Sequence, residues 1–381
     1  RFQRSSLSDG MPIITLPRKI IFQRDIYKDA GDLLRTYLGK RVLVIVDPNV
    51  LRIHGEKIKE MLRGLEYFVW SDVPPEPSVN DVLNAFGKIR GNYTSVMAVG
   101  GGSVIDFAKS LAYLLSNPNG DLRSINPFES INLKTTLIAV PTTSGTGSDA
   151  SFGVVLTDNG RKLAMGNYDL VPLIIVLDPS FTPSQENIVR STGLDALVHA
   201  FEALVANTAS IFTDALAEKS ILTIVRNLPL AIMNNDDAKD AMHIAATMAG
   251  MAFSNSGTAM AHALGHAFGA TFHVVHGVSV ALFLPHVIKF NSVDATANAK
   301  YRYISGLLGF GGDVDGLIEG LLRLYREIKQ PIAVRELGID KDAYFSAIDT
   351  MSRKAIEESE LSFNPVIPGE DDIKSIFEKA W

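Results

Sequence analysis

The 381-residue sequence contains no cysteine, which excludes disulfides, thiolate nucleophiles, Fe–S clusters and cysteine-bound zinc. Any metal must therefore be bound by histidine, aspartate or glutamate. Runs rich in lysine or arginine are also absent, and the net charge of -6 gives no basic surface for nucleic acid or an anionic membrane. No apolar stretch reaches the about 18 residues that a membrane-spanning helix needs. We therefore expect a small-molecule ligand, with no nucleic acid and no membrane as partner.

The first seventeen residues, RFQRSSLSDGMPIITLP, lack the apolar core of a signal peptide. We therefore expect a cytoplasmic protein. The chain is also longer than one typical hydrophobic core requires, which favours two domains and an enzyme over a small binding module.

Short apolar runs alternate with polar helical stretches between about residues 40 and 180. The runs are RVLVIVD (41–47), SVMAVG (95–100), TLIAVP (136–141) and LIIVLDP (173–179). Runs of this kind, bounded by glycine, proline or aspartate, are typical of strands that are buried on both faces. They predict an α/β domain, residues 1–188, with an open and mostly parallel Rossmann-like sheet.

Helical spacing replaces these runs after about Thr192. In the segment STGLDALVHAFEALVANT (191–208) the apolar residues recur at helical intervals and form one stripe. The stripe consists of Leu194, Leu197, Val198, Phe201, Leu204 and Val205. The change of period predicts that residues 189–381 form an all-α helical bundle domain.

A glycine-rich turn follows the second predicted strand, in MAVGGGSVIDFAK (97–109). Glycines let backbone N–H groups approach a pyrophosphate, and the start of a helix adds partial positive charge. Ser103 and Asp106 have the spacing of a capping box, which predicts that a helix begins there. We count Gly101, Gly102 and Ser103 as candidate cofactor-binding residues, although such a turn can also occur without a ligand.

A second loop, PTTSGTGSD (141–149), follows another predicted strand and carries five hydroxyl side chains without bulk. Such a loop suits the phosphates and ribose of a dinucleotide. Asp47 ends the first predicted strand, where an acid can accept the adenosine ribose hydroxyls and repel a 2′-phosphate. An aspartate at a strand end is also common in turns, so a purely structural role is the alternative.

Four of the eight histidines fall in GTAMAHALGHAFGATFHVVHG (257–277). Asp195 and His199 are four residues apart on one predicted helix, and His262 and His266 repeat that spacing on a second helix. His276 follows after a short break. One such histidine is more often a core or surface residue, but the combination in a protein without cysteine favours a metal centre in the bundle.

These segments resemble the iron-dependent (group III) alcohol dehydrogenases. The resemblance is carried by GGGSVIDFAK, PTTSGTGSD, STGLDALVHAFEA, AMAHALGHAFGATFHVVHG with LFLPHVIKFN, and FNPVIPGEDDIKSIFEKAW, in the family's order over roughly residues 14 to 381. It implies a divalent iron whose ligands are Asp195, His199, His262 and His276. It also implies NAD contacts at Asp47, Gly101, Gly102, Thr142, Thr143, Thr146 and Lys162.

The resemblance implies that His266 lies beside the nicotinamide rather than on the metal, and we expect it to relay a proton during catalysis. Asp149 stands where the family usually has glutamate, and His273 stands where it often has aspartate or asparagine. The role of His273 is open, with a surface or pocket-lining position as alternatives.

The expected function is hydride transfer between a nicotinamide cofactor and a small alcohol, aldehyde or ketone, by a homodimer or larger homo-oligomer. Zn²⁺, Ni²⁺ or Mn²⁺ could replace Fe²⁺ at such a site, and NADP is a weaker candidate than NAD. Related alternatives are a maleylacetate-reductase-like enzyme and a glycerol- or sugar-phosphate dehydrogenase. A metallohydrolase is a remote alternative, since it would leave both phosphate-type loops unexplained.

Overall fold

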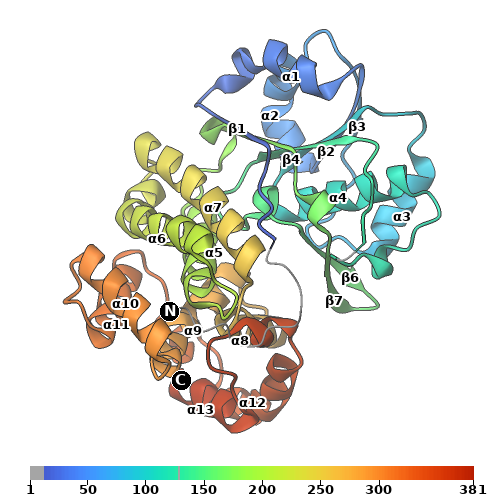
Figure 1. Ribbon diagram of the computed structural model, residues 1–381. Helices are drawn as coiled ribbons and strands as arrows, with labels where there is room; N and C mark the ends of the chain where they lie inside the picture. Colours follow the sequence, from blue (N-terminus) through green and yellow to red (C-terminus); the bar gives the residue numbers. More distant parts are fainter. Residues whose placement is uncertain (1–12, 128) are drawn as a thin grey trace.

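The structure is a computed structural model that describes residues 13–127 and 129–381, and it has a sheet-containing part and a helical part (Figure 1). The first twelve residues of the segment examined for a signal peptide lie outside the described residues.

The first part contains a six-stranded sheet whose paired strands all run parallel. The strand order is β1-β8-β5-β4-β2-β3, and β6 and β7 form a separate antiparallel hairpin. The strands are β1 (Lys19–Phe22), β2 (Arg41–Val46), β3 (Glu66–Trp70), β4 (Ser95–Gly100), β5 (Thr136–Pro141), β6 (Gly153–Asp158), β7 (Arg161–Gly166) and β8 (Ile174–Leu177). The predicted α/β fold class is therefore confirmed.

The four strands predicted from apolar runs are β2, β4, β5 and β8, and all four lie inside the sheet. The sequence pattern did not indicate β1 and β3, because these edge strands leave side chains such as Phe22 and Phe68 exposed. It also missed the hairpin β6–β7, which lies outside the sheet and alternates between buried and exposed residues.

Helices cover both faces of this sheet. Residues 42, 44 and 46 of β2 contact the cluster that contains α1 (Ala30–Leu38) and α2 (Pro48–Met61). Residues 43 and 45 point the other way, into the cluster of α3 (Val79–Lys88) and α4 (Gly102–Ser116). This alternation follows from the two-residue period of a strand and explains why the strands are apolar throughout.

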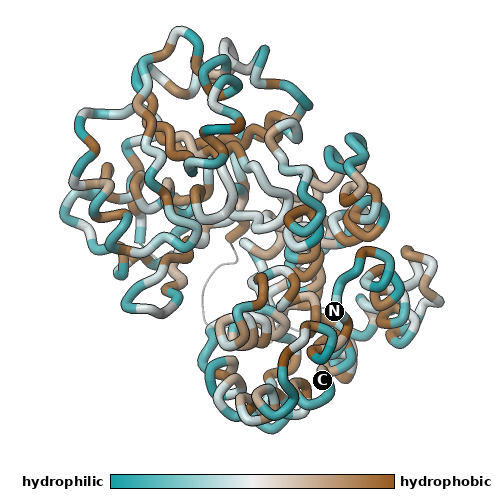
Figure 2. The backbone as a smooth tube through the Cα atoms, turned by 180° about the vertical axis from the view of Figure 1, so that it is seen from behind, coloured by the Kyte–Doolittle hydropathy of each residue, from teal (hydrophilic) through white to brown (hydrophobic). Residues whose placement is uncertain are grey.

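The second part is helical, as predicted, and no strand follows Leu177 among the described residues. Its helices are α5 (Glu186–Val205), α6 (Ile211–Ile232), α7 (Asp236–Ser256), α8 (Met260–Phe272), α9 (His276–Asn291), α10 (Ala295–Leu308), α11 (Val314–Glu327), α12 (Lys341–Ile356) and α13 (Glu370–Lys379). In Figure 2 the hydrophobic backbone runs along the sheet and through the middle of these helices, with hydrophilic segments outside.

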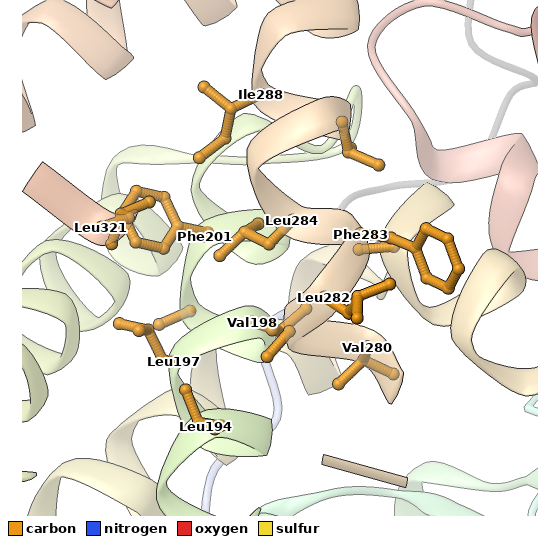
Figure 3. Close-up of a cluster of buried hydrophobic side chains, with 14 of the residues drawn as sticks. Leu194, Leu197, Val198, Phe201, Val280, Leu282, Phe283, Leu284, Ile288 and Leu321 are labelled. Atoms are coloured by element: carbon orange, nitrogen blue, oxygen red, sulfur yellow. The ribbon is translucent and has the colours of Figure 1, made fainter. Parts of the chain in front are cut away.

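Helix α5 is the central helix of this part. All six residues of its predicted apolar stripe lie in the core. The opposite side of the helix is buried as well, because every residue from Gly193 to Val205 is buried. Leu194, Leu197 and Val198 lie in the same hydrophobic core cluster as Val280 and Leu284 of α9 (Figure 3). The polar residues of α5 are therefore buried as well, and they need partners inside the protein.

The core predicts a large effect of truncating Phe283, which is fully buried between the rings of Phe268 and Phe377. Phe283→Ala should lower the free energy of unfolding by about 3–5 kcal/mol, because it removes apolar contacts and leaves a cavity. The measurement is urea unfolding followed by circular dichroism. Phe212→Ala is the matched control, since Phe212 is 65% exposed and its truncation should cost less than about 0.5 kcal/mol. Equal losses in both variants would contradict this account of the core.

Candidate active site

Four predicted metal-ligating side chains meet inside the helical part. Asp195 and His199 come from α5, His262 from α8, and His276 is the first residue of α9. The Asp195 Oδ1 atom lies 3.1 Å from His276 Nε2 and 3.6 Å from His262 Nε2. His199 Nδ1 is 3.8 Å from the same oxygen, and its ring stacks on that of His262. Thus residues 81 positions apart in the sequence surround one carboxylate oxygen.

Three atoms of this group are buried without a hydrogen-bond partner among the described residues. They are Asp195 Oδ1, His199 Nδ1 and His262 Nε2. Buried polar atoms are normally paired, because an unpaired one loses its hydration without compensation. One carboxylate oxygen and imidazole nitrogens form a donor set that suits a divalent first-row transition metal. The residues present therefore fit the metal that the sequence implies.

Glu202, also on α5, holds His262 in place. Its Oε2 lies 2.6 Å from His262 Nδ1, and its carboxylate accepts hydrogen bonds from the backbone N–H groups of Ala259, Ala261 and His262. The carboxylate thus caps the start of α8 and leaves His262 Nε2 facing Asp195. Carboxylates of this kind orient metal-binding histidines in many proteins.

The electrostatics of the group agree with this arrangement. Burial raises the pKa of Asp195, but the surrounding imidazoles together lower it more, so the pKa lies well below its ordinary value and the carboxylate is ionised. Burial lowers the pKa of His199 to about 3, which keeps this imidazole neutral. Burial also lowers the pKa of His262, but Glu202 and Asp195 outweigh it and raise the value to about 10. A cation bound here would take the place of that proton.

His266, the predicted proton relay, lies at the edge of this group. Its ring stacks on His276, with centroids 5.2 Å apart, and its Nδ1 is 3.6 Å from Glu358 Oε2. About a third of its side chain is exposed, so the ring is accessible to water. His273 is exposed and ends α8 in a left-handed conformation with φ 55°, so it caps the helix.

The two phosphate-type loops lie together at one edge of the sheet, because β4 and β5 are neighbours and both loops follow carboxyl ends. A Cβ atom added to Gly101 would lie 3.4 Å from Thr143 Oγ1, and one added to Gly102 would lie 2.9 Å from Thr146 Cγ2. Thr142 donates its backbone N–H to the carbonyl of Gly100. Helix α4 begins here without a side-chain cap, so its first N–H groups are available to an anion.

The predicted capping box at Ser103 is wrong. Gly101 is the N-cap of α4, and the Ser103 hydroxyl donates to the carbonyl of Pro75. Asp106 is buried instead and accepts from Ser148 and Val155. The helix begins two residues earlier than the predicted capping box implies, and its N-cap has no side-chain hydrogen bond.

Two further predicted cofactor residues make structural contacts. Asp47 follows β2 and caps α2, since its Oδ1 accepts from the backbone N–H groups of Asn49 and Val50. Lys162 lies on β7, is mostly exposed, and its Nζ is 3.3 Å from Glu76 Oε1.

Sequence reasoning missed Glu202. It lies seven residues after Asp195 and three after His199, which places all three on one face of α5. The sequence therefore contains a signal, an acidic residue in register with two candidate ligands, but the local pattern does not show that this acid contacts a histidine on another helix.

Comparison with known proteins agrees with this geometry. Residues 17–179 match the family described as iron-containing alcohol dehydrogenase, and residues 189–381 match the C-terminal part of the Fe-containing alcohol dehydrogenase family. An alcohol dehydrogenase of Thermococcus barophilus is 33% identical over 90% of this chain and 92% of its own length. The NADPH-dependent butanol dehydrogenase of Clostridium saccharobutylicum is 32% identical over 94% of this chain and 96% of its own length.

The fold also matches that of a solved relative. The iron-containing alcohol dehydrogenase of Thermococcus thioreducens has a TM-score of 0.88 and 32% identity, and the match covers 97% of this chain and 99% of the other. The predicted activity, nicotinamide-linked oxidoreduction of alcohols with iron, is confirmed at the level of the family. The chain therefore belongs to the iron-containing alcohol dehydrogenase family.

Proposed function

We propose that this protein interconverts small alcohols and their aldehydes or ketones, with NAD as hydride carrier and iron bound by Asp195, His199, His262 and His276. The observation that carries the proposal is the set of buried, unpaired atoms that face one another in this group. In a metal-free reductase of the same superfamily these buried atoms would have neither a hydrogen bond nor a metal to replace their lost hydration. Membership of the family also favours an oxidoreductase over the metallohydrolase alternative.

When bound, a divalent metal polarises a carbonyl oxygen or stabilises an alkoxide. The chain's own residues arrange the reaction around it. Glu202 fixes the orientation of His262, and the surrounding helices exclude water from Asp195 and His199, which are at most 6% exposed. His266 is positioned at the edge, where an imidazole can pass a proton between the substrate oxygen and solvent.

The cofactor site of this proposal lies on the loops after β2, β4 and β5. The phosphates would meet Gly101, Gly102 and Ser103 at the start of α4, and the hydroxyl groups of Thr142, Thr143 and Thr146 would surround them. The second carboxylate oxygen of Asp47 would accept the ribose hydroxyls while the first one caps α2. Lys162 would reach the cofactor from the hairpin.

The division into domains 1–188 and 189–381 stays a proposal. The predicted boundary falls in the first turn of α5, so this helix would join the two domains. Cytoplasmic location is also proposed. Each helix in the described part of the chain is too short or too polar to cross a lipid bilayer.

A homodimer or larger homo-oligomer is proposed as well. Strand β1 is an edge strand of the sheet, and its Ile20 and Phe22 side chains are 38% and 64% exposed. An open edge with apolar side chains is a surface that proteins usually cover, and pairing with a second copy of the chain would cover it.

Loss of a ligand should remove the metal. His276→Ala should lose most bound iron and lower turnover by about 10³-fold, as expected for the loss of about 4 kcal/mol of transition-state stabilisation. Elemental analysis and aldehyde-dependent oxidation of NADH measure the two effects. His273→Asn is the control, because it changes a nearby histidine at a left-handed position that asparagine tolerates. Undiminished iron in His276→Ala would show that the ligand set is wrong.

Cofactor choice should depend on Asp47. Asp47→Gly should lower the preference for NADH over NADPH by about tenfold or more, because it removes like-charge repulsion of the 2′-phosphate. Glycine is a tolerated N-cap, so α2 should lose only a few tenths of a kcal/mol. Asp340→Gly, which removes the same kind of cap from α12, should leave the preference unchanged. The ratio of kcat/KM for the two cofactors is the measurement, and an unaltered ratio in Asp47→Gly would remove this residue from the site.

His266 should affect turnover without affecting the metal. His266→Ala should retain iron and lower kcat by about 10²–10⁴-fold, the usual contribution of general acid–base catalysis. His266→Gln should behave similarly, because an amide keeps polar contacts but does not exchange protons near neutral pH. If His266→Ala lost its iron as completely as His276→Ala, His266 would be a ligand. Full activity in both variants would leave it a packing residue.

A further inference from the structure

Helix α7 of the helical part contacts the loop Pro141–Asp149 of the sheet part at three successive points. The Ser144 hydroxyl lies 3.0 Å from His243 Nδ1, and the Thr247 hydroxyl donates to Asp149 Oδ2 at 2.7 Å. Residues 243, 247 and 250 are spaced by one turn each and form one stripe of α7. In Figure 1 this helix lies on the side of the bundle that faces the sheet.

The third contact brings two backbones together. A Cβ atom added to Gly147 would lie 2.5 Å from Gly250 Cα, and one added to Gly250 would lie 2.6 Å from the Gly147 carbonyl oxygen. Gly147 also has φ +63°, a conformation that favours glycine. The two backbones are therefore in close contact, and neither position has room for a side chain.

The loop is divided between two surfaces. Thr143 and Thr146 lie against Gly101 and Gly102 of the glycine-rich turn, whereas Ser144, Gly147 and Asp149 contact α7. Ser144 thus lies between Thr143 and Thr146, two of the three threonines proposed for the cofactor, but its own side chain hydrogen-bonds to the helical part. Its hydrogen bond fixes the segment from which those threonines extend.

The protonation state of His243 suits it to accept the Ser144 hydrogen bond. It is 1% exposed, and burial lowers its pKa to about 4, so the ring is neutral in ordinary buffers. A neutral imidazole has one donor and one acceptor nitrogen, so Nδ1 can accept the Ser144 hydroxyl hydrogen. His243 plays no part in the metal group, and nothing in the proposed reaction uses it.

We propose that His243 is a positioning residue for the dinucleotide and acts through Ser144. Its imidazole fixes the loop Pro141–Asp149 against α7, and the loop then presents Thr143 and Thr146 to the cofactor. A residue of the helical part of the chain thereby contributes to the affinity for the cofactor. The inference rests on the proposed cofactor site.

The test is titration of the iron-loaded enzyme with NADH, followed by NADH fluorescence, together with kcat at saturating cofactor. Ser144→Ala and His243→Phe should each raise the Kd for NADH by about tenfold, the loss expected for one hydrogen bond. The double variant should be no weaker than either single one, because both remove the same contact. His243→Asn supplies an acceptor near the position of Nδ1 and should restore the Kd to within about threefold of wild type.

Ser220→Ala is the matched control. Its hydroxyl is buried and donates to the Ala245 carbonyl of α7 at 2.8 Å, so its hydrogen bond is made to the helix rather than to the loop. This variant should lose similar stability and keep the wild-type Kd. In all variants iron content should be unchanged and kcat should stay within about twofold, because the metal group is intact.

Several results would overturn the inference. One is an unchanged Kd for NADH in Ser144→Ala. This substitution removes only a hydroxyl group, so the variant remains testable even if His243→Phe does not fold. A second is an equal rise of Kd in Ser220→Ala, which would indicate a general loss of stability. A third is a double variant in which the free-energy losses of NADH binding from the two single variants add up. A wild-type enzyme that failed to bind NADH would overturn the proposed cofactor site itself, whereas normal binding by wild type and variants alike would overturn this inference alone.

Discussion

The candidate metal centre depends on a buried carboxylate, that of Glu202, which caps the start of α8 and accepts from His262. Burying this charge would be costly alone, but three backbone N–H groups and one imidazole compensate it. The same contacts fix where α8 begins relative to α5. His262 is therefore brought to Asp195 and His199 by the packing of two helices rather than by a flexible loop.

In the proposed function, the two parts of the molecule supply different halves of the chemistry. Neighbouring parallel strands bring the loops after β4 and β5 to one edge, which provides glycines, hydroxyl groups and a helix start for an anionic cofactor. The helical part provides the buried carboxylate and imidazoles. Contacts between α7 and the loop Pro141–Asp149 connect the halves, so the hydride carrier and the metal can be held in a fixed relation.

Much of this arrangement follows from sequence patterns. Continuous apolar runs revealed the inner strands, because both of their faces are covered, and the i, i+4 spacing placed Asp195 beside His199. Edge strands such as β1 were missed because they are largely exposed and do not need a continuous apolar run. Glu202 and His243 were missed for another reason: their partners lie more than fifty positions away in the sequence. The helical period aligns Glu202 with Asp195 and His199, but it does not encode the contact with His262.

The central claim is that one metal ion is held between Asp195, His199, His262 and His276. The most direct measurement is a crystal structure of the iron-loaded protein with anomalous data collected at the iron absorption edge. The account predicts one strong anomalous peak within coordination distance of these four side chains. A peak instead among His266, Glu358 and Glu360, whose potential ligand atoms also lie within 4.8 Å of one another, would contradict it.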